Sequence, residues 1–125
     1  MAKDIEKKAV NLPHDHGNLG NGLLDHIPSK EDMATVADAM KQLGDQTRLR
    51  IFWILCHCEE CVTDIAAMME MSSPAVSHHL RLLKDSKLIV ARRDGKEMYY
   101  TASDSDLAQE LHSTIEKIGH ITCPK

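Results

Sequence analysis

The stretch LCHCEECVTD, residues 55 to 64, holds three of the four cysteines in the chain together with one histidine and three carboxylates. Two residues separate Cys58 from Cys61, and this spacing lets two thiolates bind one soft metal ion. In a reducing compartment, closely spaced cysteines indicate metal binding or redox chemistry more often than a structural disulfide. The stretch therefore predicts a metal site or, alternatively, a thiol switch.

The composition is that of one domain of ordinary size, since the chain has 125 residues, of which 42% are hydrophobic. No run of about 18 apolar residues could span a membrane, and the amino terminus lacks the hydrophobic run of a signal peptide. We therefore expect a cytoplasmic protein with no membrane partner. The formal net charge of -4 argues against a protein that simply coats nucleic acid, so the local distribution of charge has to be considered.

Capping residues and apolar periodicity predict five helices after a mobile arm at residues 1-28, where glycine and proline interrupt any regular period. The expected helices run from Ser29 to Gly44, from Asp45 to about His57, from Val62 to Met69, from Pro74 to Lys84, and onward from Ser103 or Asp104. The sequence thus predicts a mainly α domain at residues 29-120, followed by a short tail at 121-125.

A β-hairpin is expected between the last two helices. The runs LIVARR and KEMYYTA flank Asp94-Gly95, a pair that suits the positive φ angles of a type I′ turn. Two helices joined by a tight turn, followed by this hairpin, resemble a winged helix-turn-helix.

Basic residues gather in the same region, because residues 72 to 100 contain six basic and three acidic side chains, a net charge of +3. A basic face alone is equally typical of a solvated surface, but the order of helix, turn, helix and hairpin is more specific. Short polar side chains and an arginine on the second helix can reach base edges and phosphates, and the hairpin tip can contact the DNA backbone. The candidate DNA-binding residues are Ser73, Ser77, His78, Arg81, Arg92, Arg93 and Lys96.

Three segments carry a family resemblance: LGDQTRLRIFWIL, ECVTDIA and SSPAVSHHLRLLKDSKLIVARRDGKEMYY. They resemble the ArsR/SmtB family of metal-sensing winged-helix repressors over roughly residues 33 to 120. The resemblance implies a homodimer joined by the first and last helices. It also implies that the chain binds double-stranded operator DNA and releases it when an inducer binds.

The resemblance also points to metal ligands at the start of the third helix, where Cys61 and Asp64 match the family's motif. Thr63 stands where thiol-rich members carry a second cysteine, and Cys58 could replace that ligand. Some members complete such a site with an amino-terminal arm, and His14 and His16 are the candidate donors here.

The family's other metal site spans the last helices of two subunits. The residues at its positions here are Asp104, Asp106, Lys117 and His120. A protonated lysine is a poor ligand near neutral pH, so this site requires Glu116 or His112 as a substitute. Otherwise Asp104 and Asp106 are acids that interact favourably with the dipole at the start of the helix.

Four other side chains have simpler expected roles. Cys56 is expected to be a small core residue, His57 to face solvent at a helix end, and His79 to pack or hydrogen-bond within the domain. Cys123, in the tail HITCPK, is a minor candidate ligand in a dimer.

The sequence thus predicts a dimeric repressor that senses Zn(II), Cd(II) or Pb(II). The alternative is a redox-sensing repressor of the same fold, in which Cys58 and Cys61 form a disulfide. We do not expect an enzyme, because no recognised motif assembles a base, a nucleophile and an oxyanion donor.

Overall fold

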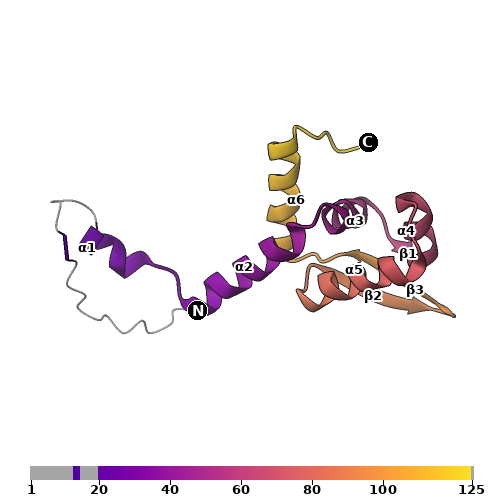
Figure 1. Ribbon diagram of the computed structural model, residues 1–125, viewed down its shortest axis with the longest axis horizontal. Helices are drawn as coiled ribbons and strands as arrows, with labels where there is room; N and C mark the ends of the chain where they lie inside the picture. The colour runs from indigo at the N-terminus through magenta and orange to yellow at the C-terminus, as the bar shows by residue number, and fades with distance from the viewer. Residues whose placement is uncertain (1–12, 15–19, 125) are drawn as a thin grey trace. The chain divides into compact units, whose positions relative to one another are not determined.

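The computed structural model describes residues 13-14 and 20-124 (Figure 1). The chain divides into the units Met1–Ala37 and Asp38–Lys125. In the first unit, a short helix α1 (Gly20–Leu23) leads into a 3₁₀ turn, η1 (Leu24–His26). Residues 20 to 26 of the predicted mobile arm thus form two short helical turns, and the mobility of the arm stays a prediction. Most of that arm lies outside the described residues.

Helix α2 (Lys30–Leu43) begins where the sequence predicts, since the Ser29 hydroxyl accepts a hydrogen bond from the Asp32 amide at 3.1 Å. Helix α3 (Gln46–His57) is capped in the same way by Asp45, whose carboxylate accepts from the Arg48 amide at 2.9 Å. These hydrogen bonds satisfy amides that have no partner within the helix. Both predicted helix starts are confirmed.

The remaining helices are α4 (Val62–Met69), α5 (Ser73–Asp85) and α6 (Asp106–Gly119). The predicted bounds of α4 are confirmed, and the Ser72 hydroxyl caps α5 by accepting a hydrogen bond from the Ala75 amide at 3.3 Å. The start of α6 differs from the prediction, because its cap is Ser105 rather than Ser103 or Asp104. The Ser103 hydroxyl instead accepts a hydrogen bond from the Ser105 amide just before the helix.

A three-stranded antiparallel sheet has the order β1-β3-β2, with β1 (Glu60–Cys61), β2 (Ile89–Asp94) and β3 (Glu97–Ala102). The predicted hairpin is confirmed, but its loop is Gly95–Lys96 because Asp94 pairs with Glu97. Of the two loop residues only Gly95 has a positive φ, 64°, as in a type II′ turn rather than the predicted type I′ turn. The two-residue strand β1 was not predicted, because two residues are too short to show an alternating pattern.

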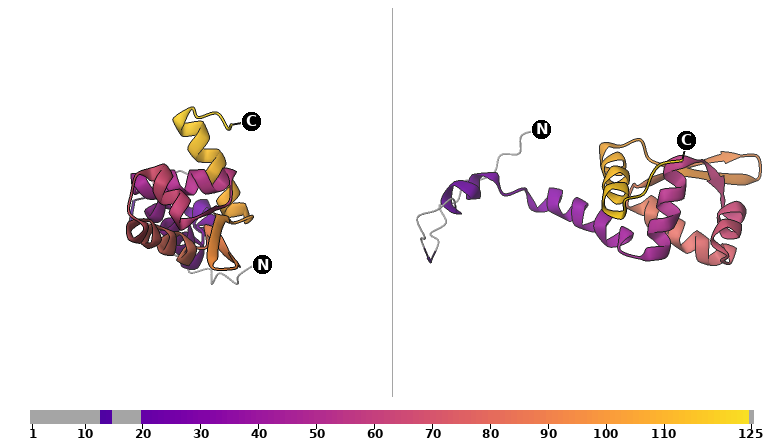
Figure 2. Two further views of the ribbon diagram at one scale, coloured as in Figure 1. Left: turned by 90° about the vertical axis from the view of Figure 1, so that its right-hand side faces the viewer. Right: turned by 90° about the horizontal axis from the view of Figure 1, so that it is seen from above.

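The core of the second unit lies where α3, α4 and α5 meet the base of the hairpin. Its largest fully buried side chains are Phe52, Ile51, Leu55, Ile65, Leu80, Leu83, Leu88, Ile89 and Val76. From α6, only Ala108 is fully enclosed. The hairpin tip and α6 lie at opposite ends of this unit (Figure 2).

Several large apolar side chains remain exposed on helices α2 and α6. Met33 and Met40 on α2 are 52% and 60% exposed, and Ile118 on α6 is 76% exposed. Such residues at helical spacing form apolar surface that remains exposed within the described part of the chain. Among the described residues, no helix combines the length and the apolar character needed to cross a membrane.

Candidate DNA-binding surface and metal-binding cluster

Helix α5 separates a buried face from an exposed polar face. Val76, Leu80 and Leu83 are buried in the core, and their spacing of three and four residues fixes the rotation of the helix. The four candidate DNA-binding residues of this helix are all exposed: Ser73, Ser77, His78 and Arg81. The Arg81 guanidinium lies 3.0 Å from Nδ1 of His78, so the two side chains are neighbours on the exposed face.

His79 has a different environment from His78. Its Nδ1 atom lies 3.1 Å from the Arg48 guanidinium, which also donates to the carbonyl of Gln42 at 2.7 Å. Burial lowers the pKa of His79 and outweighs the opposite effect of Asp45. The predicted role of His79 within the domain is confirmed, and the contact joins the start of α3 to α5.

The basic residues of the hairpin differ in their surroundings. Arg92 donates two hydrogen bonds to Glu59 at 2.8 and 2.6 Å, and its guanidinium carbon lies 5.0 Å from the centre of the Tyr99 ring. The hydrogen bonds lower the pKa of Glu59 and raise that of Arg92. Arg93 and Lys96 are exposed, and no ion pair of theirs appears within the described part of the chain. Phosphate would have to compete with Glu59 for Arg92.

The predicted thiol ligands, Cys58 and Cys61, occupy different environments. Cys58 is exposed, and its thiol donates to the carbonyl of Ile54 at 3.4 Å. Desolvation, followed by the charge of Glu60, raises its pKa. Cys61 is buried, with only 8% of its surface exposed, on strand β1.

The other predicted ligands of this site do not gather around the two thiols. Asp64 is exposed in the first turn of α4. Within the described residues, Cys58, Cys61 and Asp64 do not belong to a group of three or more metal-binding side chains. His14 lies in the first unit, and His16 lies outside the described residues. This ligand set stays a prediction.

The residues of the predicted second site lie at the two ends of α6. Asp104 and Asp106 stand at its start, and His120 follows its last residue. A helix of 14 residues is about 21 Å long, so one chain cannot bring these side chains to a single ion. A site of this kind needs two chains, as the resemblance implies, and it also stays a prediction.

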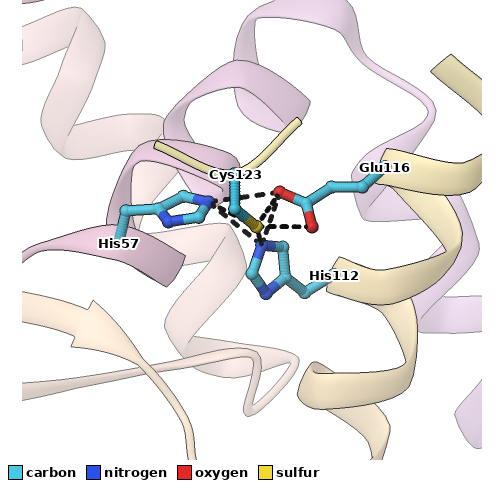
Figure 3. A group of neighbouring side chains, drawn as sticks. All are labelled: His57, His112, Glu116 and Cys123. Atoms are coloured by element: carbon cyan, nitrogen blue, oxygen red, sulfur yellow. Dashed lines mark hydrogen bonds and ion pairs between the residues drawn. The ribbon is translucent and has the colours of Figure 1, made fainter. Parts of the chain in front are cut away.

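The structure instead brings together four side chains from distant parts of the sequence: His57, His112, Glu116 and Cys123. One ligand atom from each lies within 4.8 Å of all the others. Figure 3 shows the two imidazoles, the carboxylate and the thiol converging on one small volume. We call this group the four-residue cluster. Side chains of these types, held this close, are able to bind a divalent metal ion.

Two helices and the carboxyl-terminal tail supply the cluster. His112 and Glu116 are four residues apart on α6, which places them on the same face, and His57 is the last residue of α3. These three side chains are only 15% to 24% exposed. The expectation that His57 faces solvent is therefore wrong, because α6 packs beside the end of α3.

Cys123 reaches the cluster because the chain reverses after α6. His120 has a left-handed backbone with φ of 53°, and its amide donates to Lys117. The Ile121 amide donates to the carbonyl of Glu116 at 2.9 Å. Together these bonds form a Schellman motif, which turns the tail back along the helix. The Cys123 thiol then lies 2.7 Å from the oxygens of Glu116.

The carboxylate of Glu116 has the strongest electrostatic perturbation in the cluster. Its pKa is lowered to about 2, first by the hydrogen bond from Cys123 and then by those from Trp53 and His112. The same bond raises the pKa of Cys123. Without a metal ion, therefore, the thiol stays protonated and donates a hydrogen bond to the ionised carboxylate.

Part of the cluster was visible in the sequence. The four-residue step from His112 to Glu116 is a known sign of a shared helix face, and both residues were considered as substitute ligands. His57 and Cys123 are 66 positions apart, and no local pattern joins them. Cys56 matches its expected role, since it packs against the core and burial raises its pKa to about 12.

Comparison with known proteins agrees with this architecture. The family described as "Bacterial regulatory protein, arsR family" matches residues 45-90. The transcriptional repressor SmtB homolog of Synechocystis sp. is 38% identical over 79 residues, which are 63% of this chain and 60% of that protein. The cadmium resistance transcriptional regulatory protein CadC homolog of Staphylococcus aureus is 39% identical over 82 residues, which are 65% of this chain and 68% of that protein.

A solved structure extends the comparison to the fold. It is the homodimeric winged helix-turn-helix DNA-binding domain (fragment 1-100) of Mb0332 from Mycobacterium bovis, a possible ArsR-family transcriptional regulator. The match has a TM-score of 0.65 and 30% identity, and it covers 74% of this chain and 88% of that chain. The predicted winged helix-turn-helix fold is confirmed. By its sequence and its fold, the chain belongs to the ArsR/SmtB family of transcriptional regulators.

Proposed function

We propose that this chain is a metal-responsive transcriptional repressor, which binds operator DNA as a homodimer and releases it when a divalent metal ion binds. The observation that carries the proposal is the exposed polar face of α5, which the buried Val76, Leu80 and Leu83 hold outward from the core. The name of the SmtB homolog, a transcriptional repressor, supports repression, and the name of the CadC homolog, a cadmium resistance regulator, supports the metal response.

In the proposed complex, α5 enters the major groove. Ser73 and Ser77 offer short donors and acceptors to phosphates or base edges, and Arg81 can form two hydrogen bonds with one guanine. The hairpin lies beside the helix and contacts the DNA backbone through Arg93 and Lys96. Arg92 joins these contacts only when phosphate displaces Glu59.

The proposed dimer uses the exposed apolar side chains of α2 and α6. Met40 and Ile118 are 60% and 76% exposed, and a second copy of the chain would remove them from water. The homodimeric state of the Mb0332 domain supports this arrangement. Two copies of α5 would then read two half-sites of one operator.

The inducer in this proposal is Zn(II), Cd(II) or Pb(II). A metal ion that binds more tightly to the dimer shape with low operator affinity shifts the population towards that shape. By linkage, operator DNA must weaken metal binding by the same factor.

The direct test uses fluorescence anisotropy of labelled DNA from the region upstream of the gene that encodes the chain. The reduced, metal-free protein should bind this DNA more tightly than a scrambled duplex, and Zn(II) or Cd(II) should release it. Equal affinity for both duplexes would refute the DNA-binding assignment, and binding that no metal ion alters would refute the metal response.

Replacing Arg81 with alanine should weaken operator binding by about 1-3 kcal/mol if the side chain reads a base. The loss should be largest for the natural operator, because a guanine contact contributes nothing on unrelated sequences. Anisotropy titrations on operator and random DNA measure both values. Lys117→Ala removes an exposed positive charge from α6 and serves as the matched control. Unchanged operator affinity in Arg81→Ala would remove this residue from the interface.

The paired substitution Arg93→Ala and Lys96→Ala should weaken binding to operator and random DNA alike. Each lost phosphate contact should also reduce the slope of log affinity against log salt by about 1. Arg92→Ala should have a smaller effect, because Glu59 already pairs with this guanidinium at 2.6 Å. Titrations at several salt concentrations test this ranking, and a change confined to sequence preference would contradict it.

A further inference from the structure

The four-residue cluster has the geometry of an almost complete tetrahedral metal site. Six distances join four ligand atoms, and a tetrahedral Zn(II) ion with ordinary bond lengths requires about 3.3-3.6 Å for each of them. The Nε2 atoms of His57 and His112 are 3.1 Å apart, and they lie 3.3 and 3.0 Å from Oε2 of Glu116. Sγ of Cys123 is 3.8 Å from each imidazole nitrogen. Five of the six distances therefore need changes of a few tenths of an ångström at most.

The sixth distance, 2.7 Å from the Cys123 sulfur to the Glu116 carboxylate, is short for a tetrahedral pair. It corresponds to a hydrogen bond that the protonated thiol donates to the carboxylate. When a metal ion enters, the thiol proton passes to solvent, the thiolate binds the ion, and the sulfur and oxygen separate. Because Cys123 is exposed on the tail, the tail can make this adjustment without disturbing the core.

Without an ion, the four side chains of the cluster offer more hydrogen-bond acceptors than donors to one another. The two Nε2 atoms face each other, and at most one of them can donate in that contact if both rings are neutral. Both also face a carboxylate oxygen that already accepts the Trp53 indole N–H at 3.1 Å. A single cation at the centre satisfies all four groups at once.

The donor set decides which ions fit. Two neutral imidazoles, one carboxylate and one thiolate carry a combined charge of -2, which matches a divalent ion. Mg(II) and Ca(II) prefer oxygen ligands alone, whereas one sulfur and two nitrogens favour Zn(II), Co(II) or Cd(II). The Trp53 indole and the Glu116 carboxylate form the outer hydrogen bond that typically orients a ligand of such an ion.

We propose that His57, His112, Glu116 and Cys123 bind one Zn(II)-like divalent ion within a single chain and thereby fasten the tail to the end of α3. The site differs from the pair of thiols in LCHCEECVTD and from the two-chain site of Asp104, Asp106 and His120. It also fixes Ile121, which lines a 330 Å³ cavity with residues of α3 and α6. That this ion controls operator release rests on the proposed function.

The first experiment measures metal binding without DNA. Reduced, metal-free protein is titrated with Co(II), and absorption reports the thiolate-to-cobalt charge transfer and the visible bands of four-coordinate cobalt. We expect one Co(II) per chain, displaced by Zn(II). Cys123→Ser should lose the charge-transfer band and weaken Co(II) binding by at least about 100-fold, beyond the 10- to 100-fold typical of outer-shell changes.

Two variants serve as matched controls. Cys58→Ser removes the other exposed thiol, and His120→Gly removes an imidazole while keeping the left-handed turn that directs the tail. Both should bind Co(II) like the unaltered chain. The proposal is overturned if Cys123→Ser keeps the charge-transfer band, or if Cys58→Ser loses it.

A second measurement uses Trp53, the single tryptophan of the chain. Its ring centre lies 4.4 Å from that of His57, so Zn(II) should change its emission in the unaltered chain but not in Glu116→Gln at the same concentration. An equal response in Glu116→Gln would exclude this carboxylate as a ligand. A Co(II) titration of Trp53→Phe, read by absorption, should show about 10-fold weaker Co(II) binding, because the orienting hydrogen bond is lost.

Operator binding is then measured separately. Metal-free Cys123→Ser should bind operator like the unaltered chain but should not release it when Zn(II) is added. Release by Zn(II) in this variant would show that the regulatory ion binds elsewhere. If the unaltered chain binds no operator, the proposed function fails, while the Co(II) titration still decides whether the cluster is a metal site.

Discussion

In the proposed dimer, replacing Ile118 with glutamate is expected to separate the two chains and to lower the affinity for the proposed operator by about 100-fold or more. The side chain is 76% exposed on α6, so the charge costs the isolated chain little but opposes burial in a dimer interface. A dimer gains operator affinity because it binds the second half-site at a high effective concentration. This advantage is about 10²- to 10⁴-fold, and a monomer loses it. Sedimentation measures the association state, and anisotropy measures the affinity.

Two further variants test whether the exposed faces of α2 and α6 form the proposed dimer interface. Met40→Glu should have a similar effect from the exposed face of α2, where this methionine is 60% exposed. Met68→Glu introduces the same charge at an exposed position of α4 and should leave the association state unchanged. A dimeric Ile118→Glu protein with normal operator affinity would rule out α6 as part of the interface.

Replacing Phe52 with alanine is expected to lower the free energy of unfolding by about 3-5 kcal/mol. Phe52 is fully buried at the centre of α3, among residues of α4, α5 and β2. Truncation removes its contacts and leaves a cavity that these elements cannot fully close. Urea denaturation at fixed protein concentration, followed by the emission of Trp53, gives the change, since the stability of a dimer depends on concentration.

The matched control for this substitution is Val90→Ala, because Val90 is 51% exposed on β2. Surface changes of this kind usually alter stability by less than about 0.5 kcal/mol. The dependence of the unfolding free energy on urea should be the same in both variants if they unfold in one step. A loss below 1 kcal/mol for Phe52→Ala would contradict the central position of this side chain.

Helix α3 connects the candidate metal cluster to the candidate DNA-binding helix. Its last residue, His57, belongs to the cluster, while Arg48 in its first turn contacts His79 of α5 at 3.1 Å. Phe52 lies between them in the core. A metal ion that changes how α3 and α6 pack would therefore act on the same helix that supports α5.

The sequence by itself determined the elements that depend on local interactions. Ser29, Asp45 and Ser72 each offer an oxygen to an amide at most three residues away, so the start of a helix can be recognised without knowing the fold. The spacing of Val76, Leu80 and Leu83 likewise identifies the buried face of α5, and the exposed face follows from it. The family was recognisable for the same reason, since its segments are continuous in the sequence.

The tertiary structure alone decided which side chains meet. Cys58 and Cys61 are close in sequence, but a helix end and a strand give them different environments, one exposed and one buried. In the sequence, Arg92 is one of several basic residues of the hairpin. Only the tertiary structure shows that the Glu59 carboxylate lies 2.6 Å from its guanidinium.

His57 and Cys123 show the same limit most clearly. They come within 3.8 Å of each other only because α6 packs beside α3 and the chain reverses at His120. Local patterns report hydrogen bonds and periodicity within a few residues, whereas a metal site requires atoms from distant segments to converge. That convergence depends on how the core packs, and no short stretch of sequence contains this information.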